Sequence, residues 1–503
     1  MRNHLKVVVL SLNLVFSLSC SLFASPGAPL PGSTPTLASE LPAPSLSPVL
    51  PPATPGTVAL PTSTPSPGPA PQTPAGTLAP TGLNATGPHV LFTGPGGIWI
   101  SNPDGSFPTR VSGYELQRDL RRAISPTGDR LALVISNDQG LDLVVVKIPG
   151  GEVETIARLL SITRDEEVGD PTSSKAFAAY AIRDYESVAW QPGAGRLLAF
   201  TGAINGPSAD LYLYDFETQE ITQLTDDPSQ ATSPNWSPDG QYILNFDVSW
   251  VPPFGGAIGG ANRLDGVWAV QISDGKVITL PKPQGILPNF VGWQDEAHYL
   301  SYDSDDDCYS QNLHSVSVVS GETTPIMDFS FYYQIAQSTE NGALLFSSAE
   351  GCASSLGEGV FLLLPGQTAP ARLLDKRAYG IYWMPESRVF FAYPEALFSS
   401  DGSAQYDPPV YESSYEPAVS QNGYQAWEVI ENQEGRVVVK VPEGEWQTVQ
   451  TGLVAQLIWD PVGGQTLLIA LQDGSLYAAT FPDFTPHLMG NLGGAVDQAI
   501  WLP

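Results

Sequence analysis

Short runs of alternating apolar and polar positions fill the chain after residue 88, and the stretch from Ala209 to Phe246 shows the pattern most clearly. There, Leu211 and Leu213 alternate with Tyr212 and Tyr214, and a polar turn leads into a second short run, ITQLT. Period-two alternation bounded by Pro, Asp and Gly is typical of short antiparallel strands. We therefore predict an all-β fold.

The same unit recurs along the chain, mostly about every 40–47 residues, which is the period of four-stranded propeller blades. A tight Ser-Pro-Asp-Gly turn at 237–240 shows the punctuation, because Pro presets φ and Gly accepts positive φ. The pattern predicts a single β-propeller of four-stranded antiparallel blades. The raw count is nine, and eight is also plausible because the unit at Tyr379 is the weakest. The inner strands begin at Ala123, Val188, Pro234, Val291, Ile335, Tyr379, Ala418, Leu457 and Ala499.

The two ends of the repeat array complement each other. The first segment, from His89, has no inner strand before it, and the last, from Ala499, has no strand after it. Pairing them would complete one blade, close the ring and remove its free edges. A large aromatic recurs at one inner-strand position, and we expect core packing between blades there rather than a binding cage. Its members are Trp190, Trp236, Trp293, Trp383, Trp459 and Trp501.

The PNWSPDG turn and the LYLYD…TQLT strand pair resemble the repeat of the TolB-like, or WD40-like (PD40-type), β-propeller family. The resemblance extends over the chain after His89 and is strong only between Ala209 and Phe246. It implies the propeller fold and says little about function. TolB has an α/β domain before its propeller, and here a Pro-rich segment takes that place, so its partners are not carried over.

The first 24 residues combine Arg2 and Lys6 with a long apolar run, as in a secretory signal. Cys20 follows Phe-Ser-Leu-Ser, which resembles a bacterial lipoprotein cleavage site; ordinary cleavage after Ala24 is the alternative. Residues 25–88 are rich in Pro, Ser and Thr, with roughly one proline in four. Such a segment does not bury enough apolar surface to fold, and we expect a disordered stalk before a propeller at 89–503.

Acidic residues dominate the charge, with 52 Asp and Glu against 22 Lys and Arg and a net charge of −30. Nucleic acid is therefore excluded as a non-specific partner, and we expect membrane contact only through the N-terminal lipid. We expect a monomer.

Long insertions fall only in connections that share one face of a propeller, which favours binding on that face. They are 158–186, 249–262, 303–312, 347–358 and 406–416. Candidate ligand-binding aromatics there are Trp250, Phe254, Tyr411 and Tyr415, which could equally fold onto their blades. Asp303, Asp305, Asp306 and Asp307 are candidate calcium ligands, although a solvated acidic loop explains them as well.

Cys308 and Cys352 are the only cysteines besides Cys20, and they predict a disulfide in an oxidising compartment. Each stands six positions beyond the end of the second strand of its blade, at Tyr302 and Phe346. The two should therefore occupy equivalent loops of neighbouring blades.

Catalytic patterns are absent: the five histidines are scattered, no G-x-S-x-G elbow occurs, and the chain ends where the ring closes. We therefore expect a non-enzymatic, extracytoplasmic propeller, anchored to the cell membrane or cell surface, that binds a protein, peptide or glycan on its insertion-bearing face. The alternative is an extracellular glycan- or peptide-acting enzyme that uses carboxylates of that face.

Overall fold

The structure is a computed structural model in which the chain divides into two units, Met1–Pro71 and Gln72–Pro503. All the residues that it describes lie in the second unit. They are 82–84, 87–114, 119–169, 173–184, 186–251, 261–283, 289–303, 310–331, 335–338, 341–348, 356–376, 378, 380–383, 389–393, 396–406, 409 and 413–502.

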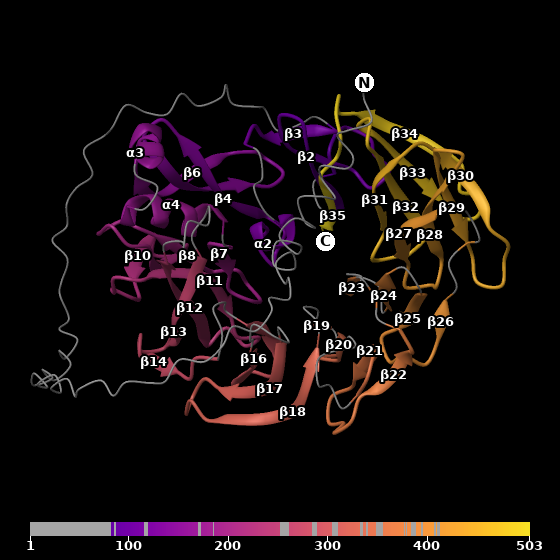
Figure 1. Ribbon diagram of the computed structural model, residues 1–503. Helices are drawn as coiled ribbons and strands as arrows, with labels where there is room; N and C mark the ends of the chain where they lie inside the picture. Colours follow the sequence, from indigo (N-terminus) through magenta and orange to yellow (C-terminus); the bar gives the residue numbers. More distant parts are fainter. Residues whose placement is uncertain are drawn as a thin grey trace, which may run out of the picture. The chain divides into compact units, whose positions relative to one another are not determined.

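The described residues form nine antiparallel sheets, eight of four strands and one of three, which follow one another around a ring (Figure 1). We number them as blades 1 to 9. Blades 1 to 3, from the inner strand outward, are β35 (Gln498–Leu502), β1 (His89–Gly94), β2 (Gly97–Ser101), β3 (Thr109–Ser112); β4 (Arg130–Asn137), β5 (Gly140–Lys147), β6 (Val153–Ser161); β7 (Val188–Trp190), β8 (Leu197–Gly202), β9 (Asp210–Asp215), β10 (Glu220–Gln223).

Blades 4 to 6 are β11 (Gln230–Trp236), β12 (Tyr242–Val251), β13 (Ala261–Gln271), β14 (Val277–Leu280); β15 (Phe290–Trp293), β16 (His298–Asp303), β17 (Ser310–Ser317), β18 (Thr323–Phe331); β19 (Ile335–Gln337), β20 (Leu344–Ser348), β21 (Gly359–Leu363), β22 (Ala371–Leu374). Blades 7 to 9 are β23 (Gly380–Trp383), β24 (Val389–Tyr393), β25 (Ala396–Ser399), β26 (Gln405–Tyr406); β27 (Ser413–Val419), β28 (Gln425–Glu431), β29 (Glu434–Lys440), β30 (Gln447–Thr451); β31 (Val454–Trp459), β32 (Thr466–Leu471), β33 (Ser475–Thr480), β34 (Pro486–Asn491).

The propeller prediction is confirmed, and so is the higher blade count, because the unit at Tyr379 forms a complete four-stranded sheet. Ring closure is confirmed as well. The last strand, β35, pairs antiparallel with β1, with Trp501 opposite Val90 and Ile500 opposite Leu91. Blade 1 therefore joins the two ends of the array, and the ring has no free blade edge at that point.

Inter-blade packing explains the recurring tryptophans. The Nε1–H of Trp190 donates to the carbonyl of Ala123 (2.8 Å), and that of Trp236 donates to Ala189 (2.9 Å). Trp383 and Trp459 make the equivalent bonds, to Ala336 (3.0 Å) and Ala418 (3.1 Å). Each of these four indoles thus ties its inner strand to the innermost element of the preceding blade, which is α2 for Trp190 and an inner strand for the others. This confirms the expectation of core packing.

Blade 2 differs from the prediction. Instead of an inner strand at Ala123 it has a one-turn helix, α2 (Leu120–Ala123), and only a single bridge joins Ile124 to Leu131. The Asp119 carboxylate caps this helix by accepting a hydrogen bond from the backbone N–H of Arg121 (2.9 Å). Capping by Asp119 stabilises the helical conformation of Leu120–Ala123, where the sequence analysis predicted the start of a strand at Ala123.

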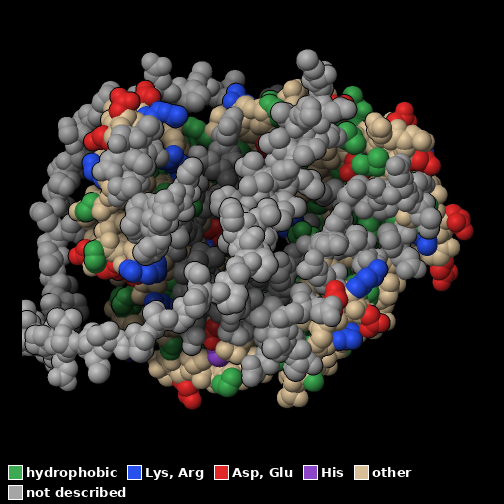
Figure 2. Space-filling model, viewed as in Figure 1, with side chains coloured by type: hydrophobic (Ala, Val, Ile, Leu, Met, Phe, Trp, Pro, Cys, Tyr) green, Lys and Arg blue, Asp and Glu red, His purple; other side chains and the backbone are tan. Residues whose placement is uncertain are grey.

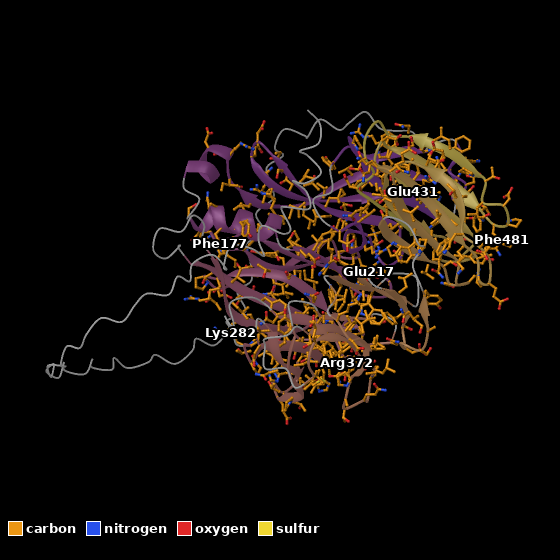
Figure 3. The ribbon with its side chains drawn as sticks, turned by 45° about the vertical axis from the view of Figure 1, so that its right-hand side comes forward. Phe177, Glu217, Lys282, Arg372, Glu431 and Phe481 are labelled. Carbon is orange, nitrogen blue, oxygen red and sulfur yellow. The ribbon has the colours of Figure 1, made fainter. Side chains whose placement is uncertain are left out.

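Two more helices, α3 (Arg164–Gly169) and α4 (Ser174–Asp184), lie in the segment 158–186, which we expected to be a long loop insertion. Thr163 and Glu166 form a capping box, with Thr163 N–H donating to Glu166 Oε2 (2.8 Å). Helix α4, which carries Phe177 (Figure 3), contacts β6, β8 and β11. Its buried alanines join the core between blades 2 and 3, so this insertion is part of the folded body.

Candidate functional site

In each blade the connections between the second and third strands, and those between blades, lie on one face of the ring, which we call the loop face. The opposite face, which carries the first-to-second turns, is the turn face. At 237–240 this turn has the predicted form, since Ser237 Oγ donates to Asp239 Oδ1 (2.6 Å) and Gly240 adopts a φ of 69°. Such turns leave little room for elaboration.

Of the four predicted aromatic anchors, the structure describes the backbone of two. Trp250 lies near the end of β12, with its backbone paired to Asn262. Tyr415 lies in β27, paired to Glu428, while Phe254 and Tyr411 fall outside the described residues. Binding by these four residues stays a prediction.

The acidic loop of blade 5 is described only at its first residue. Asp303 is 7% exposed and accepts hydrogen bonds from Asn312 Nδ2 and His314 Nε2, both at 3.2 Å. Asp305, Asp306 and Asp307 lie outside the described residues, so calcium binding there stays a prediction. Among the residues with described positions, no group of three or more His, Cys, Asp or Glu side chains is arranged to hold a metal ion.

The three cysteines also lie outside the described residues, as do the predicted signal segment and most of the predicted stalk. Lipidation of Cys20 and the bond between Cys308 and Cys352 therefore remain predictions. No helix within the described ranges is long and apolar enough to cross a membrane.

The structure gathers a carboxylate cluster on the loop face that the sequence analysis missed. Asp210 opens β9 of blade 3, Asp227 lies in the connection from blade 3 to blade 4, and Asp247 lies in β12 of blade 4. Asp210 and Asp247 are 3% and 2% exposed, whereas Asp227 is only half-buried. The three acids thus combine two interior carboxyls with one that reaches solvent.

Asp210 is held by donors from the same blade. Its Oδ2 accepts from Gln223 Nε2 (3.2 Å), and its Oδ1 accepts from Thr225 Oγ1 (3.4 Å) and from the backbone N–H of Asp227 (3.3 Å). Burial is the main cause that raises the pKa of Asp210 to about 7, and the charges of Asp227 and Asp226 add to it. Near neutral pH this side chain is therefore only partly ionised.

Asp247 interacts with both neighbours in its own blade and with Asp227. The Nε1–H of Trp268 donates to its Oδ2, and Asn245 Nδ2 donates to its Oδ1 (3.3 Å). Burial first, and the nearby Asp227 carboxyl second, raise the pKa of Asp247 to about 8. Both causes favour the protonated form of Asp247, in which its carboxyl can donate a hydrogen bond to Asp227.

Two interacting carboxyls, of which one has a strongly raised pKa, form an arrangement that enzymes use to move protons at a reacting bond. Strongly raised acid pKa values caused by burial and by a like charge also mark candidate functional sites in general. One sequence signal pointed here: Asn245 and Asp247 occupy alternate positions of the otherwise apolar run YILNFDV, so both face the same side of the sheet.

No protein-family model matches the chain. A segment of 55 residues, 11% of this chain, is 46% identical to the uncharacterized peptidase YuxL of Bacillus subtilis (strain 168), of which it covers 8%. Dipeptidyl peptidase 4 of Porphyromonas gingivalis is 9% identical with a TM-score of 0.42, over 80% of this chain and 59% of that one. TolB from Acinetobacter baumannii is 12% identical with a TM-score of 0.25, over 74% and 82%.

These structural likenesses are consistent with the TolB-like propeller fold and carry no further argument at such identities. The chain spans only a small part of YuxL and less than two thirds of the dipeptidyl peptidase. The expectation of a non-enzymatic protein is nevertheless contradicted by the short sequence match to YuxL, which is named as a peptidase. Missing catalytic motifs did not exclude an enzyme, since a carboxyl pair assembled from two blades has no local sequence motif.

Proposed function

We propose that this protein is an extracytoplasmic enzyme that acts on peptides, with the carboxyl pair of Asp227 and Asp247 as its proton-transfer group. One observation carries the proposal: the buried carboxyl of Asp247 interacts with the half-buried carboxyl of Asp227 on the loop face, and burial together with this neighbour raises the pKa of Asp247. The short match to a protein named as a peptidase supports peptides over glycans as the substrate. The signal-like first 24 residues support the location, and Cys20 supports a lipid anchor.

The two carboxyls take different roles because their exposure differs. Asp227 is half-buried and meets the substrate, so its carboxylate accepts a proton from a water molecule whose oxygen attacks the peptide carbonyl carbon. The same proton then passes to the leaving nitrogen, and one water is added across the broken C–N bond. Asp247, at 2% exposure, does not reach the substrate and instead positions Asp227 through its hydrogen bond.

The chain's charge selects among peptides. Asp226 is exposed beside Asp227, and the whole protein carries a net charge of −30. Acidic side chains recur around the part of the surface visible in Figure 2. Such a field concentrates cationic peptides at the loop face, and the effect weakens as salt screens it.

The experiment is a rate measurement with the mature protein on a defined mixture of basic and neutral peptides at pH 6.5. Asp227→Asn should lower the rate by about 10²–10⁴-fold, the usual contribution of a general base. Asp226→Asn, which changes the adjacent exposed carboxylate, is the matched control and should retain most of the activity. Absence of cleavage by the wild type, or equal losses in the two variants, would overturn the proposal.

A further inference from the structure

Blade 2 is the one described sheet without a fourth strand, and its inner edge faces the centre of the ring. Strand β4 pairs along its whole length with β5 on its outer side. On its inner side, the bonds among the described residues are the bridge from Ile124 to Leu131, a hydrogen bond from Ser125 N–H to the Arg130 carbonyl (2.8 Å), and one from Arg130 N–H to Ser125 Oγ (3.1 Å). An unpaired strand edge presents a row of N–H and C=O groups to any extended chain.

The register of these bonds shows which groups are exposed at the edge. Ile148 N–H donates to the Asp129 carbonyl (2.8 Å) across to β5, so odd-numbered residues of β4 direct their backbone toward β5. Even-numbered residues direct theirs inward, as Arg130 does toward Ser125. Beyond the bridge, the inward-facing groups are therefore the N–H and C=O of Val134 and Ser136. Val134 is half-buried and Ser136 is exposed.

Cavities lie at both ends of this edge. On the loop face, Ser136 and Asn137 line a cavity of about 440 Å³, whose charged lining residues are two acids and two bases: Asp138, Asp165, Arg164 and Arg183. On the turn face, Ile124 lines a cavity of about 610 Å³ beside Arg121, Arg122, Trp190 and Trp236. Both volumes fall within the range of about 300–1,000 Å³ that is usual for ligand sites. Among the described residues no strand occupies the inner position of blade 2, and a cavity lies near each end of β4.

We propose that an extended peptide binds along β4 as the fourth, innermost strand of blade 2. This peptide would be the substrate of the proposed enzyme, and that part of the inference rests on the proposed function. Main-chain bonds to Val134 and Ser136 supply recognition that is independent of peptide sequence, as in strand addition generally. The edge has room for about four to six residues above the bridge, at about 3.3 Å per residue.

The orientation follows from the other blades, in which each inner strand runs antiparallel to the second strand. A peptide in the same position enters with its amino end at the loop face, near Asp138 and Asp165, and points its carboxyl end toward Arg121 on α2. The Pro-rich segment 25–88 of this chain is a poor occupant, because proline has no N–H for the ladder.

The test uses the mature full-length protein and a decapeptide of alternating Thr and Val with an amino-terminal Lys. Hydrogen exchange should show unprotected Val134 and Ser136 amides in the free protein and protected ones with the peptide. Two modified peptides test the contact without any change to the protein. One is N-methylated at its odd-numbered residues and the other at its even-numbered residues. One of them should bind like the parent peptide, and the other should bind at least about tenfold more weakly, because it lacks the donors that face β4.

Protein variants provide a second, independent readout. Ser136→Pro removes an N–H that β5 does not use, so the fold should survive while binding falls at least about tenfold. Ser136→Thr keeps the N–H and should bind like the wild type. Equal binding by Ser136→Pro, equal binding of both N-methylated peptides, or protected edge amides in the free protein would each overturn the inference. If the peptide binds and protects the Val134 and Ser136 amides but is not cleaved, the proposed function alone is refuted. If the peptide is cleaved but these amides stay unprotected, this inference alone is refuted.

Discussion

Replacing Asp247 with asparagine tests the electrostatics of the cluster without any substrate. The pKa of Asp247 is raised to about 8 in the folded protein, against an ordinary aspartate value of about 3.9 when unfolded. Between these two values the folded state binds more protons than the unfolded state. The free energy of unfolding therefore falls as the pH rises through this window.

The magnitude follows from the width of the window. Each pKa unit corresponds to about 1.4 kcal/mol, so raising the pH from 5 to 8 should cost the wild type roughly 3–4 kcal/mol through this one group. An asparagine side chain is uncharged at both pH values and mimics the protonated acid, accepting from Trp268 and donating to Asp227. Asp247→Asn should match the wild type at pH 5 and be more stable by that amount at pH 8.

Urea denaturation of both proteins at pH 5, 6, 7 and 8 measures this difference directly. The comparison of variant with wild type cancels the titration of the carboxyls that do not interact with Asp247. Asp142→Asn is a useful contrast: that buried carboxylate is paired with Arg158, so its loss should destabilise the protein instead. A constant difference between Asp247→Asn and the wild type across the pH range would refute the raised pKa and the reasoning built on it.

Further predictions concern catalysis, the packing between blades and the three cysteines. The value of kcat/KM for peptide cleavage should fall above about pH 8, as Asp247 loses its proton; a flat alkaline limb in the pH profile would contradict its positioning role. Trp236→Phe should lower the free energy of unfolding by about 1–2 kcal/mol through loss of the bond to Ala189, whereas Trp501→Phe, whose N–H has no partner among the described residues, should cost less. Cys20→Ala should release the protein into the soluble fraction, unless the mature N-terminus proves to be Ser25. Thiol titration of the denatured, unreduced mature protein should find Cys308 and Cys352 bonded rather than free.

The propeller could be predicted from the sequence because each blade is a local unit. Its strand alternation and its turns lie within about 45 residues, so the repeat of Trp236 and the turn at 237–240 were sufficient. Ring closure followed from the missing strand at each end of the array. Local helix signals, in contrast, were overlooked: Asp119 before α2, Thr163 with Glu166 before α3, and the alanine-rich α4.

The carboxyl cluster could not be predicted in the same way. Asp210 and Asp247 come from two blades and Asp227 from the connection between them, and only the ring brings them together. Their raised pKa values depend on burial, which no sequence spacing encodes. The open edge of β4 is also a tertiary feature, because it depends on α2 replacing a strand in one blade out of nine.

Peptide cleavage in water enriched in ¹⁸O is the most direct test of the central claim. The wild-type protein should produce new fragments from a defined peptide mixture. Each amino-side fragment should carry one ¹⁸O atom in its newly formed carboxyl group, and each carboxyl-side fragment should carry none at its new amino group. Asp227→Asn should produce almost none under the same conditions, while Asp226→Asn should produce them at close to the wild-type rate. Intact peptides after prolonged incubation with folded wild-type protein, or equal labelling by Asp227→Asn, would contradict the account.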